Sequence, residues 1–142
     1  IADYGHNPDA VSTLVNTLKN IPAIKRTVVI SAAGDRRDQD IIEQGRLVGG
    51  FFDHIILYED ACQRGRPDGE TLALLQQGIA QSSSDKKQSV VEVRGEFKAI
   101  QMALDETAPD HLVLVLIDQV NEALQYLQGN TSGEAEATRA AV

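Results

Sequence analysis

The sequence predicts a three-layer α/β/α fold, in which a mostly parallel sheet of about five or six strands lies between two layers of helices. Two observations predict this fold. Short runs of β-branched and apolar residues alternate along the chain with segments whose apolar residues recur at helical spacing. Most of these runs are apolar almost throughout, which is typical of buried parallel strands, and each crossover between parallel strands needs a helix. The alternation therefore indicates a Rossmann-like layout.

The first half of the chain contains two predicted strands and two predicted helices. The strands are residues 1–3 and 26–32, and the second of them reads RTVVISA. The helices are residues 8–21 and 38–52, and each has one apolar face. These faces consist of Val11, Leu14, Val15 and Leu18 in the first helix and Ile41, Ile42, Leu47, Val48 and Phe51 in the second.

The second half continues the alternation with three strands and two helices. The strands are residues 54–59, 88–93 and 111–117, of which the last reads HLVLVLI. The helices are residues 67–81 and 95–107, again with apolar residues on one face. These are Leu72, Leu75 and Ile79 in the first and Phe97, Ile100 and Leu104 in the second.

Three of the predicted helices have residues at their N-terminal ends that favour the start of a helix. Proline is tolerated in the first helical turn, where backbone N–H groups lack partners, and Pro8 and Pro67 stand at such positions. Asn7 and Asp38 stand where N-cap residues belong, because a short polar side chain can accept a hydrogen bond from a free backbone N–H. We expect helices to begin at these positions.

Composition limits the kinds of partner. The chain has 142 residues and a net charge of −8, which makes nucleic acid and an anionic membrane poor partners and favours a cationic or zwitterionic ligand. The longest apolar run, residues 112–117, is far shorter than the roughly 20 residues that cross a bilayer, so a cytoplasmic protein is expected. With one cysteine, Cys62, and three histidines, neither a disulfide framework nor a protein-built metal site is expected.

The domain organisation follows from length and from the two ends. A chain of 142 residues suits one core, and we assign it to residues 1–128. Residues 129–142 contain few apolar side chains, which predicts a flexible tail. The chain opens on a strand without an initiator methionine, which suggests a domain from a larger multidomain enzyme.

Polar and glycine-containing segments follow the predicted strands, and in open α/β sheets ligands bind beyond the carboxyl ends of the strands. The segments are DYGHNPDA, AAGDRRDQD and EDACQRGRPDGE, after the first, second and third strands. Each also has a purely structural interpretation. Asn7 can simply cap a helix, the charges of residues 34–38 can pair within a solvated turn, residues 59–70 can form a surface loop, and Cys62 can be a small apolar residue.

Taken together, these segments resemble a known family. DYGHNPDA resembles the Asp-Tyr-(Ala/Gly)-His-Asn-Pro signature at the start of the C-terminal domain of the Mur ligases, the ATP-dependent amino acid ligases of peptidoglycan and folylpolyglutamate synthesis. AAGDRRDQDI and EDACQRGRPDGE are most similar to the cyanophycin synthetase subfamily. The resemblance covers about residues 1–128.

The resemblance implies a reaction in which ATP and Mg²⁺ activate a carboxylate as an acyl phosphate and an amine then displaces the phosphate. In this family the phosphate-binding loop lies in a preceding central domain, and this sequence contains no Gly-x-x-x-x-Gly-Lys-Ser/Thr motif. The resemblance therefore implies that the chain alone is inactive, that Mg²⁺ is held mainly by the central domain, and that the full-length protein is a homo-oligomer.

The resemblance also assigns residues to the nucleotide. The nucleotide-binding residues would be Asp3, His6, Asn7 and Asp35. Of these, Asp3 would accept hydrogen bonds from the ribose hydroxyls. Arg36 and Arg37 would be the catalytic residues at the phosphates, because guanidinium groups bind phosphate oxygens bidentately and stay charged.

The third segment is where this family selects its amino acid. Cyanophycin synthetase joins arginine to a poly-aspartate chain, so this reaction is the implied function. Arg64 or Arg66 would bind the α-carboxylate of free arginine. The substrate guanidinium would be received by Glu59, Asp60 or Glu70.

Three alternatives remain open. One is another Mur-type ligase, of the folylpolyglutamate or peptidoglycan type or one that joins prebuilt dipeptides. A second is a stand-alone Rossmann-like module that binds a nucleotide or an amino acid. The third is a structural interaction domain, which the clustering of charged segments at one sheet edge disfavours.

Overall fold

A computed structural model describes residues 1–5, 7–59, 62–83, 85 and 87–140, with side chains described as far as residue 130. Five parallel strands form one sheet in the order β1-β5-β2-β3-β4. They are β1 (Ala2–Asp3), β2 (Lys25–Ile30), β3 (His54–Glu59), β4 (Ser89–Arg94) and β5 (His111–Leu116). The predicted α/β fold with a parallel sheet is confirmed, and the strands lie within one or two residues of the predicted ranges.

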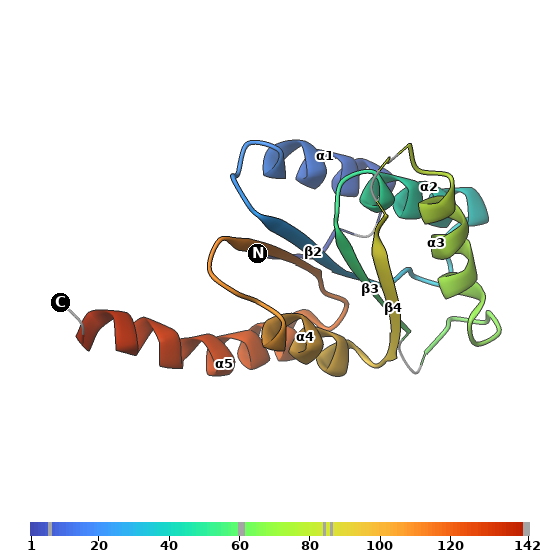
Figure 1. Ribbon diagram of the computed structural model, residues 1–142. Coiled ribbons are helices and arrows are strands. Elements are labelled where there is room, and N and C mark those ends of the chain that lie inside the picture. The colour runs from blue at the N-terminus through green and yellow to red at the C-terminus, as the bar shows by residue number, and fades with distance from the viewer. Residues whose placement is uncertain (6, 60–61, 84, 86, 141–142) are drawn as a thin grey trace.

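Helices cover both faces of the sheet (Figure 1). On one face lie α1 (Pro8–Leu18), α2 (Asp38–Gly49) and α3 (Glu70–Ala80), and on the other lie α4 (Glu96–Asp105) and α5 (Val120–Ala140). The chain moves outward from β2 to β4 with helices on the first face, then returns through α4 on the second face to β5. Crossovers of one constant hand produce this arrangement.

The core consists of two apolar layers, one on each side of the sheet. Alternate residues of β2 and β3 point to opposite sides, so Val28 and Ile55 pack under α1–α3 while Val29 and Ile56 pack against α4 and α5. All four side chains are fully buried. The near-continuous apolar runs of the sequence thus reflect strands that are covered on both faces.

Helices α1 and α2 begin at the predicted residues, whereas the cap of α2 and the start of α3 differ from the prediction. Asn7 caps α1, where its Oδ1 accepts a hydrogen bond from the Ala10 N–H at 2.8 Å, and Pro8 is the first helical residue. The expectation that Asp38 caps α2 is wrong, because Arg37 occupies the cap position and makes no side-chain capping bond. Pro67 precedes the first residue of α3 by three positions and lies in a turn. Its own carbonyl accepts a hydrogen bond from the Glu70 N–H at 3.3 Å.

Helices α2 and α3 pack with their backbones close together at two glycines. A Cβ atom on Gly78 would overlap the carbonyl oxygen of Ile42, and a Cβ atom on Gly45 would overlap that of Leu75. Neither position can accept a side chain without a shift of one helix. The two helices therefore form a rigid pair on one face of the sheet.

The helix α5 was not predicted from the sequence. It begins after β5 and includes the backbone of residues 129–140, which were expected to form a tail; residues 141–142 lie outside the described residues. Its first half packs against the sheet through Ala123, while the helix projects past α4 (Figure 1). In the described part of the chain, no helix is long and apolar enough to cross a bilayer.

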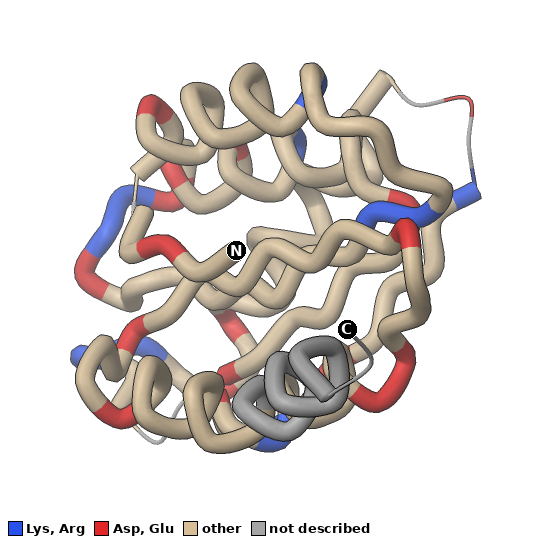
Figure 2. The backbone as a smooth tube through the Cα atoms, turned by 90° about the vertical axis from the view of Figure 1, so that its left-hand side faces the viewer, with Lys and Arg blue, Asp and Glu red and all other residues tan. Residues whose placement is uncertain are grey.

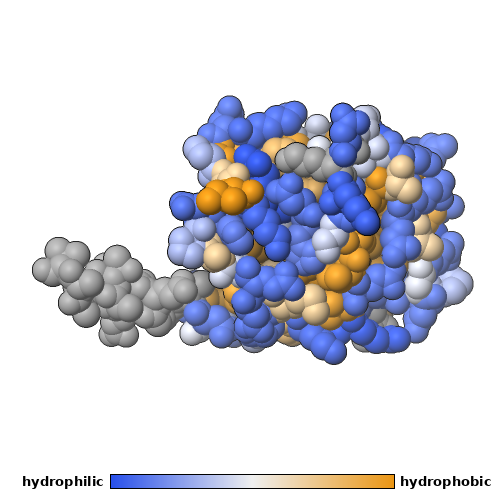
Figure 3. Space-filling model, in the orientation of Figure 1, coloured by the Kyte–Doolittle hydropathy of each residue, from blue (hydrophilic) through white to orange (hydrophobic). Residues whose placement is uncertain are grey.

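The surface is mostly polar. Figure 3 shows a largely hydrophilic face with separate apolar patches, and Ile24 is the most exposed of the large apolar residues at 78%. Charged residues are spread over the loops at the ends of the strands, and the acidic–basic–basic–acidic segment 35–38 is visible at the left of Figure 2. The four residues of this segment are exposed, whereas Glu59 of the third segment is buried.

Candidate functional site

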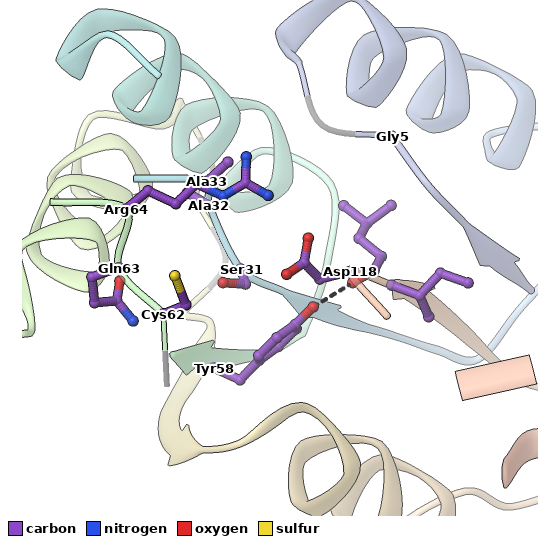
Figure 4. Close-up of a pocket in the computed structure, with 11 residues that line it drawn as sticks. Gly5, Ser31, Ala32, Ala33, Tyr58, Cys62, Gln63, Arg64 and Asp118 are labelled. Atoms are coloured by element: carbon purple, nitrogen blue, oxygen red, sulfur yellow. Dashed lines mark hydrogen bonds between the residues drawn. The ribbon is translucent and has the colours of Figure 1, made fainter. Parts of the chain in front are cut away.

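A pocket lies at the carboxyl edge of the sheet, where β5 separates β1 from β2 (Figure 4). Its lining residues are Gly5, Ser31, Ala32, Ala33, Tyr58, Cys62, Gln63, Arg64, Leu116, Ile117 and Asp118. The helix that follows β5 lies on one face, whereas the helices that follow β1, β2 and β3 lie on the other. This is the topological switch point at which open α/β sheets bind ligands.

The pocket is too small to enclose a nucleotide. Its cavity has a volume of about 30 Å³. Pockets that enclose a small ligand typically have roughly 300–1,000 Å³. A larger ligand would therefore leave most of its surface uncovered by this chain.

The floor of the pocket is a buried hydrogen-bond network that the sequence analysis missed. The Tyr58 hydroxyl donates to the Leu116 carbonyl at 3.1 Å (Figure 4). Its oxygen also lies 3.3 Å from Glu96 Oε1, so the single hydroxyl proton is shared between the two acceptors. Glu96 is 1% exposed, and its carboxylate accepts from the N–H groups of Asp118 at 2.6 Å and Gln119 at 3.2 Å. This side chain thereby holds the start of α5 and places Asp118 at the rim.

The two arginines predicted to be catalytic have different surroundings. Arg37 forms a bidentate pair with Asp40, with both N–O distances at 2.9 Å. The guanidinium of Arg36 is exposed and has no ion-pair partner among the described residues. The backbone N–H of Arg36 donates to the carbonyl of the lining residue Ala33 at 3.1 Å, so Arg36 stands one turn from the pocket.

Asp35 and Arg64 connect the second and third segments. Their side chains form an ion pair at 3.0 Å, and both are substantially exposed. The hydrogen bond from Arg64 lowers the pKa of the Asp35 carboxyl, so the pair is charged at neutral pH. Arg64 also lines the pocket, and it has a left-handed backbone with φ of 50°.

Arg66, Glu59 and Glu70 have partners within the protein. Arg66 donates to two backbone carbonyls and pairs with Asp38 and with Glu70. Glu59 is 6% exposed, and its Oε1 accepts from the Gly69 N–H at 2.7 Å and from the Thr71 hydroxyl at 3.3 Å. These contacts shape the third segment and the start of α3.

The first segment contributes a backbone hydrogen bond beside the pocket and the N-cap of α1. Asp3 ends β1, and its carbonyl accepts from the Ile117 N–H at 2.9 Å, which sets β1 beside the pocket wall. The Oδ1 of Asn7 is engaged in capping α1. His6 and Asp60, predicted for the nucleotide and for the amino acid, lie outside the described residues.

The described residues contain no complete set of protein ligands for a metal ion. Among them, no three His, Cys, Asp or Glu side chains converge at a distance that could hold a metal ion. Mg²⁺ usually keeps several waters and is bound through one or two carboxylates together with substrate phosphates, rather than by a cage of protein ligands. No step is therefore derived through a metal held by this chain alone.

The fold and the site define a class: an open parallel α/β domain with a charged ligand pocket at its topological switch point. Sequence comparison then gives the family. The profile described as "Mur ligase, glutamate ligase domain" matches residues 1–116. The chain belongs to this family of Mur ligase C-terminal domains, as its sequence motifs predicted.

Among curated relatives, the cyanophycin synthetase of Trichormus variabilis is 34% identical over 129 residues, 90% of this chain. That of Synechocystis is 35% identical over 128 residues. The UDP-N-acetylmuramoyl-L-alanyl-D-glutamate–2,6-diaminopimelate ligase of Caldanaerobacter subterraneus is 30% identical over 125 residues. The chain spans 14% of the length of the first two relatives and 25% of the third.

Solved structures share the fold. A UDP-N-acetylmuramoyl-L-alanyl-D-glutamate–2,6-diaminopimelate ligase matches with a TM-score of 0.63 and 20% identity, over 80% of this chain and 22% of that one. Escherichia coli FolC in complex with DHPP and ADP matches with a TM-score of 0.60 and 20% identity, over 80% of this chain and 24% of that one. At this level of identity the likeness establishes the architecture alone.

Proposed function

We propose that this chain is the C-terminal domain of an ATP-dependent amide ligase. A substrate carboxylate oxygen attacks the γ-phosphorus of ATP, which releases ADP and forms an acyl phosphate. The amine of an amino acid then attacks the acyl carbon, inorganic phosphate leaves, and the nitrogen loses a proton as the amide forms. The observation that carries the proposal is the exposed guanidinium of Arg36, which has no ion-pair partner among the described residues and stands one turn from the pocket.

The role of Arg36 follows from its chemistry. Both steps concentrate negative charge on phosphoryl oxygens, and a guanidinium offers bidentate donors that stay charged. Arg37 is a weaker candidate, because its fork already binds Asp40. Asp3 would bind the ribose from the end of β1, and the N-terminus of α1 would face the nucleotide. The roles of His6 and Asn7 toward the nucleotide remain predictions.

The small pocket supports a shared site. The cavity of about 30 Å³ cannot surround ATP, and the relatives are several times longer than this chain. We propose that a preceding domain holds ATP and Mg²⁺ and that this chain closes over them. Closure would bring Arg36 to the phosphates and exclude water from the acyl phosphate.

We propose arginine as the amino acid that is joined, and poly-aspartate as the acceptor. Support comes from the identity to cyanophycin synthetases, from the net charge of −8, and from the third segment, in which the exposed Arg64 can bind an α-carboxylate. Of the acids proposed for the substrate guanidinium, Glu70 keeps 41% of its side chain exposed, whereas Glu59 is buried. Asp60 remains a prediction.

The test is the change Arg36→Ala in the full-length protein that contains this chain. With arginine and poly-aspartate as substrates, we expect ATP turnover to fall about 100- to 1,000-fold, the usual loss for one donor to developing charge. The matched control is Arg46→Ala, which removes an arginine paired with Glu43 on the outer surface of α2. Thermal unfolding of both variants should be unchanged. Wild-type turnover by Arg36→Ala would remove this residue from the site.

A second candidate function is ligation of another amino acid. It is favoured by the 30% sequence identity to the diaminopimelate ligase of Caldanaerobacter subterraneus. Substrate competition separates the candidates, because each predicts a different amino acid that stimulates ATP hydrolysis. Stimulation by glutamate or diaminopimelate and not by arginine would favour the second candidate. If no amino acid stimulates hydrolysis, a binding module becomes the better interpretation.

A further inference from the structure

Two loops meet at the carboxyl edge of the sheet: the β2–α2 loop, residues 31–37, and the β3–α3 loop, residues 60–69, of which residues 60–61 are not described. We infer that Arg66 is a positioning residue that locks these loops together and so fixes where Arg36 stands, rather than a ligand of the substrate carboxylate. The inference rests on the proposed function for its kinetic consequence. Its structural consequence can be measured separately.

The first argument is the number of hydrogen bonds that Arg66 already makes. Its Nε donates to the Gly34 carbonyl at 2.6 Å, and its Nη2 donates to the Arg36 carbonyl at 2.6 Å and to Asp38 Oδ1 at 2.7 Å. Its Nη1 donates to Glu70 Oε1 at 3.0 Å. A guanidinium has five N–H donors, so a single one remains. A bidentate grip on a substrate carboxylate needs two parallel donors.

The second argument is burial. The Arg66 side chain is 16% exposed, whereas Arg64, two residues earlier on the same loop, is 44% exposed and lines the pocket. A carboxylate arriving from solvent therefore meets Arg64 first. To reach Arg66, it would have to displace Asp38 or Glu70, which already neutralise that guanidinium.

The third argument is the direct contact of the two loop backbones. A Cβ atom on Gly34 would overlap the Gln63 carbonyl oxygen, so the loops touch where no side chain fits between them. Gly34 and Arg36 are the two residues whose carbonyls Arg66 binds. Because the carbonyl of Arg36 is held, the direction of its Cα–Cβ bond is restricted, and the guanidinium starts from a defined place.

Lysine cannot replace Arg66 in this arrangement. Its ammonium is a single point, whereas the partners of Arg66 surround a planar fork on several sides. Arg66→Lys therefore preserves the charge and breaks the link between the loops. The matched control is Arg46→Lys, because Arg46 also forms a bidentate pair, with Glu43 at 2.7 and 2.5 Å, but on the outer surface of α2.

The kinetic test is a double-mutant cycle in the full-length enzyme with Arg66→Lys, Arg36→Ala and the double variant. We expect Arg66→Lys to lower kcat about 10- to 100-fold, since a displacement of about 1 Å can cost 100-fold, with little change in the KM of the amino acid. In the Arg36→Ala background the same change should have almost no further effect, because the group it positions is gone. Equal fold-losses in both backgrounds, or a raised amino acid KM at unchanged kcat, would overturn the inference.

A second measurement does not depend on activity. Amide hydrogen exchange of residues 34–38, followed by mass spectrometry in the full-length protein, should become faster in Arg66→Lys and stay unchanged in Arg46→Lys. If Arg66→Lys fails to fold, Asp38→Asn removes the charge from one partner of Arg66 and should produce a smaller effect of the same sign. Unchanged exchange in a folded Arg66 variant contradicts the inference. If the wild-type full-length protein has no ligase activity, the proposed function is contradicted, but the structural role of Arg66 is not.

Discussion

Four arginines close to the pocket show how strongly the role of a single residue depends on tertiary structure. The sequence predicted ligand roles for all four, yet Arg36 has no ion-pair partner among the described residues and Arg64 lines the pocket, whereas Arg37 forms a bidentate pair with Asp40 and Arg66 donates to four acceptors of the protein. The Arg66 bond to Gly34 spans 32 residues of sequence. No local pattern reports such a pairing, so sequence could select the loops but not divide their arginines by role.

The Asp35–Arg64 pair predicts a specific pH dependence. The pKa of Asp35 lies below the ordinary aspartate value of about 3.9, because its carboxylate accepts a hydrogen bond from Arg64. Since the folded-state pKa is depressed, the pair contributes fully above pH 3.9 and is lost as pH falls through the folded-state pKa. The pair should therefore be intact between about pH 5 and 7.

Carboxyl ¹³C NMR titration of Asp35 measures this effect. We expect the midpoint to rise toward the ordinary value in Arg64→Gln and to stay depressed in Arg46→Gln, which removes the unrelated pair with Glu43. A midpoint that is the same with and without Arg64 would show that the pair does not form in solution.

At the scale of elements, the sequence predicted five strands and four helices that the structure contains. The spacing of apolar residues was sufficient to locate these elements, because each of them buries one or both of its faces. It was insufficient for α5, whose apolar residues, such as Ala123, precede a polar stretch that resembles a tail. The cap at α2 was also mispredicted, because the Asp38 side chain accepts from Arg66 of another loop instead of from its own helix. In the case of the α2 cap, the deciding partner was a tertiary one, which a local pattern does not contain.

The close packing of α2 on α3 makes Gly78 a sensitive position. A methyl group at Gly78 would overlap the Ile42 carbonyl oxygen and approach the Arg46 nitrogen, both of which are backbone atoms of α2. We expect Gly78→Ala to lower the free energy of unfolding by about 1–3 kcal/mol, in spite of the higher helix propensity of alanine. Urea denaturation followed by circular dichroism measures the change.

Gly50→Ala is the control for this prediction. The nearest atoms to a Cβ at Gly50 are the Arg46 and Leu47 carbonyl oxygens at 3.5 and 3.7 Å, which is ordinary contact. Its backbone is in the right-handed helical region, so alanine should be neutral or stabilising by up to about 1 kcal/mol. Equal stability of the two variants would mean that α2 and α3 do not approach as closely as described.

At the scale of the whole molecule, the proposal of a shared site makes this pocket one wall of a larger site. The lining residues of the pocket come from β3, β5 and the loops that follow β1, β2, β3 and β5, but the cavity of about 30 Å³ leaves room for little more than a water-sized molecule. The position of this pocket followed from the sequence, because the carboxyl edge of an open sheet is a general ligand site. Its floor of Tyr58 and Glu96 did not, because these side chains are brought together across 38 residues.

The chain on its own should therefore bind ATP weakly or not at all. Isothermal titration calorimetry of the 142-residue chain with Mg²⁺–ATP should give no saturable heat at micromolar concentrations, whereas the full-length protein should give it. The physical reason is that most of the nucleotide would stay exposed to water, so few contacts offset the loss of its freedom. A micromolar or tighter dissociation constant for this chain alone would contradict the proposal of a shared site.

The position of β5 between β1 and β2 has a consequence for biosynthesis. During translation β1 emerges before the rest of this domain, yet its partner in the sheet is β5, the last of the described strands, more than 100 residues later, as the pairing of Ala2 with Val115 shows. A nascent chain that ends before His111 has no strand to join β1 to β2, and one edge of β2 stays open. Such long-range closure slows folding and exposes an unpaired edge. Until β5 pairs with both β1 and β2, the sheet does not hold the pocket walls that follow these strands side by side.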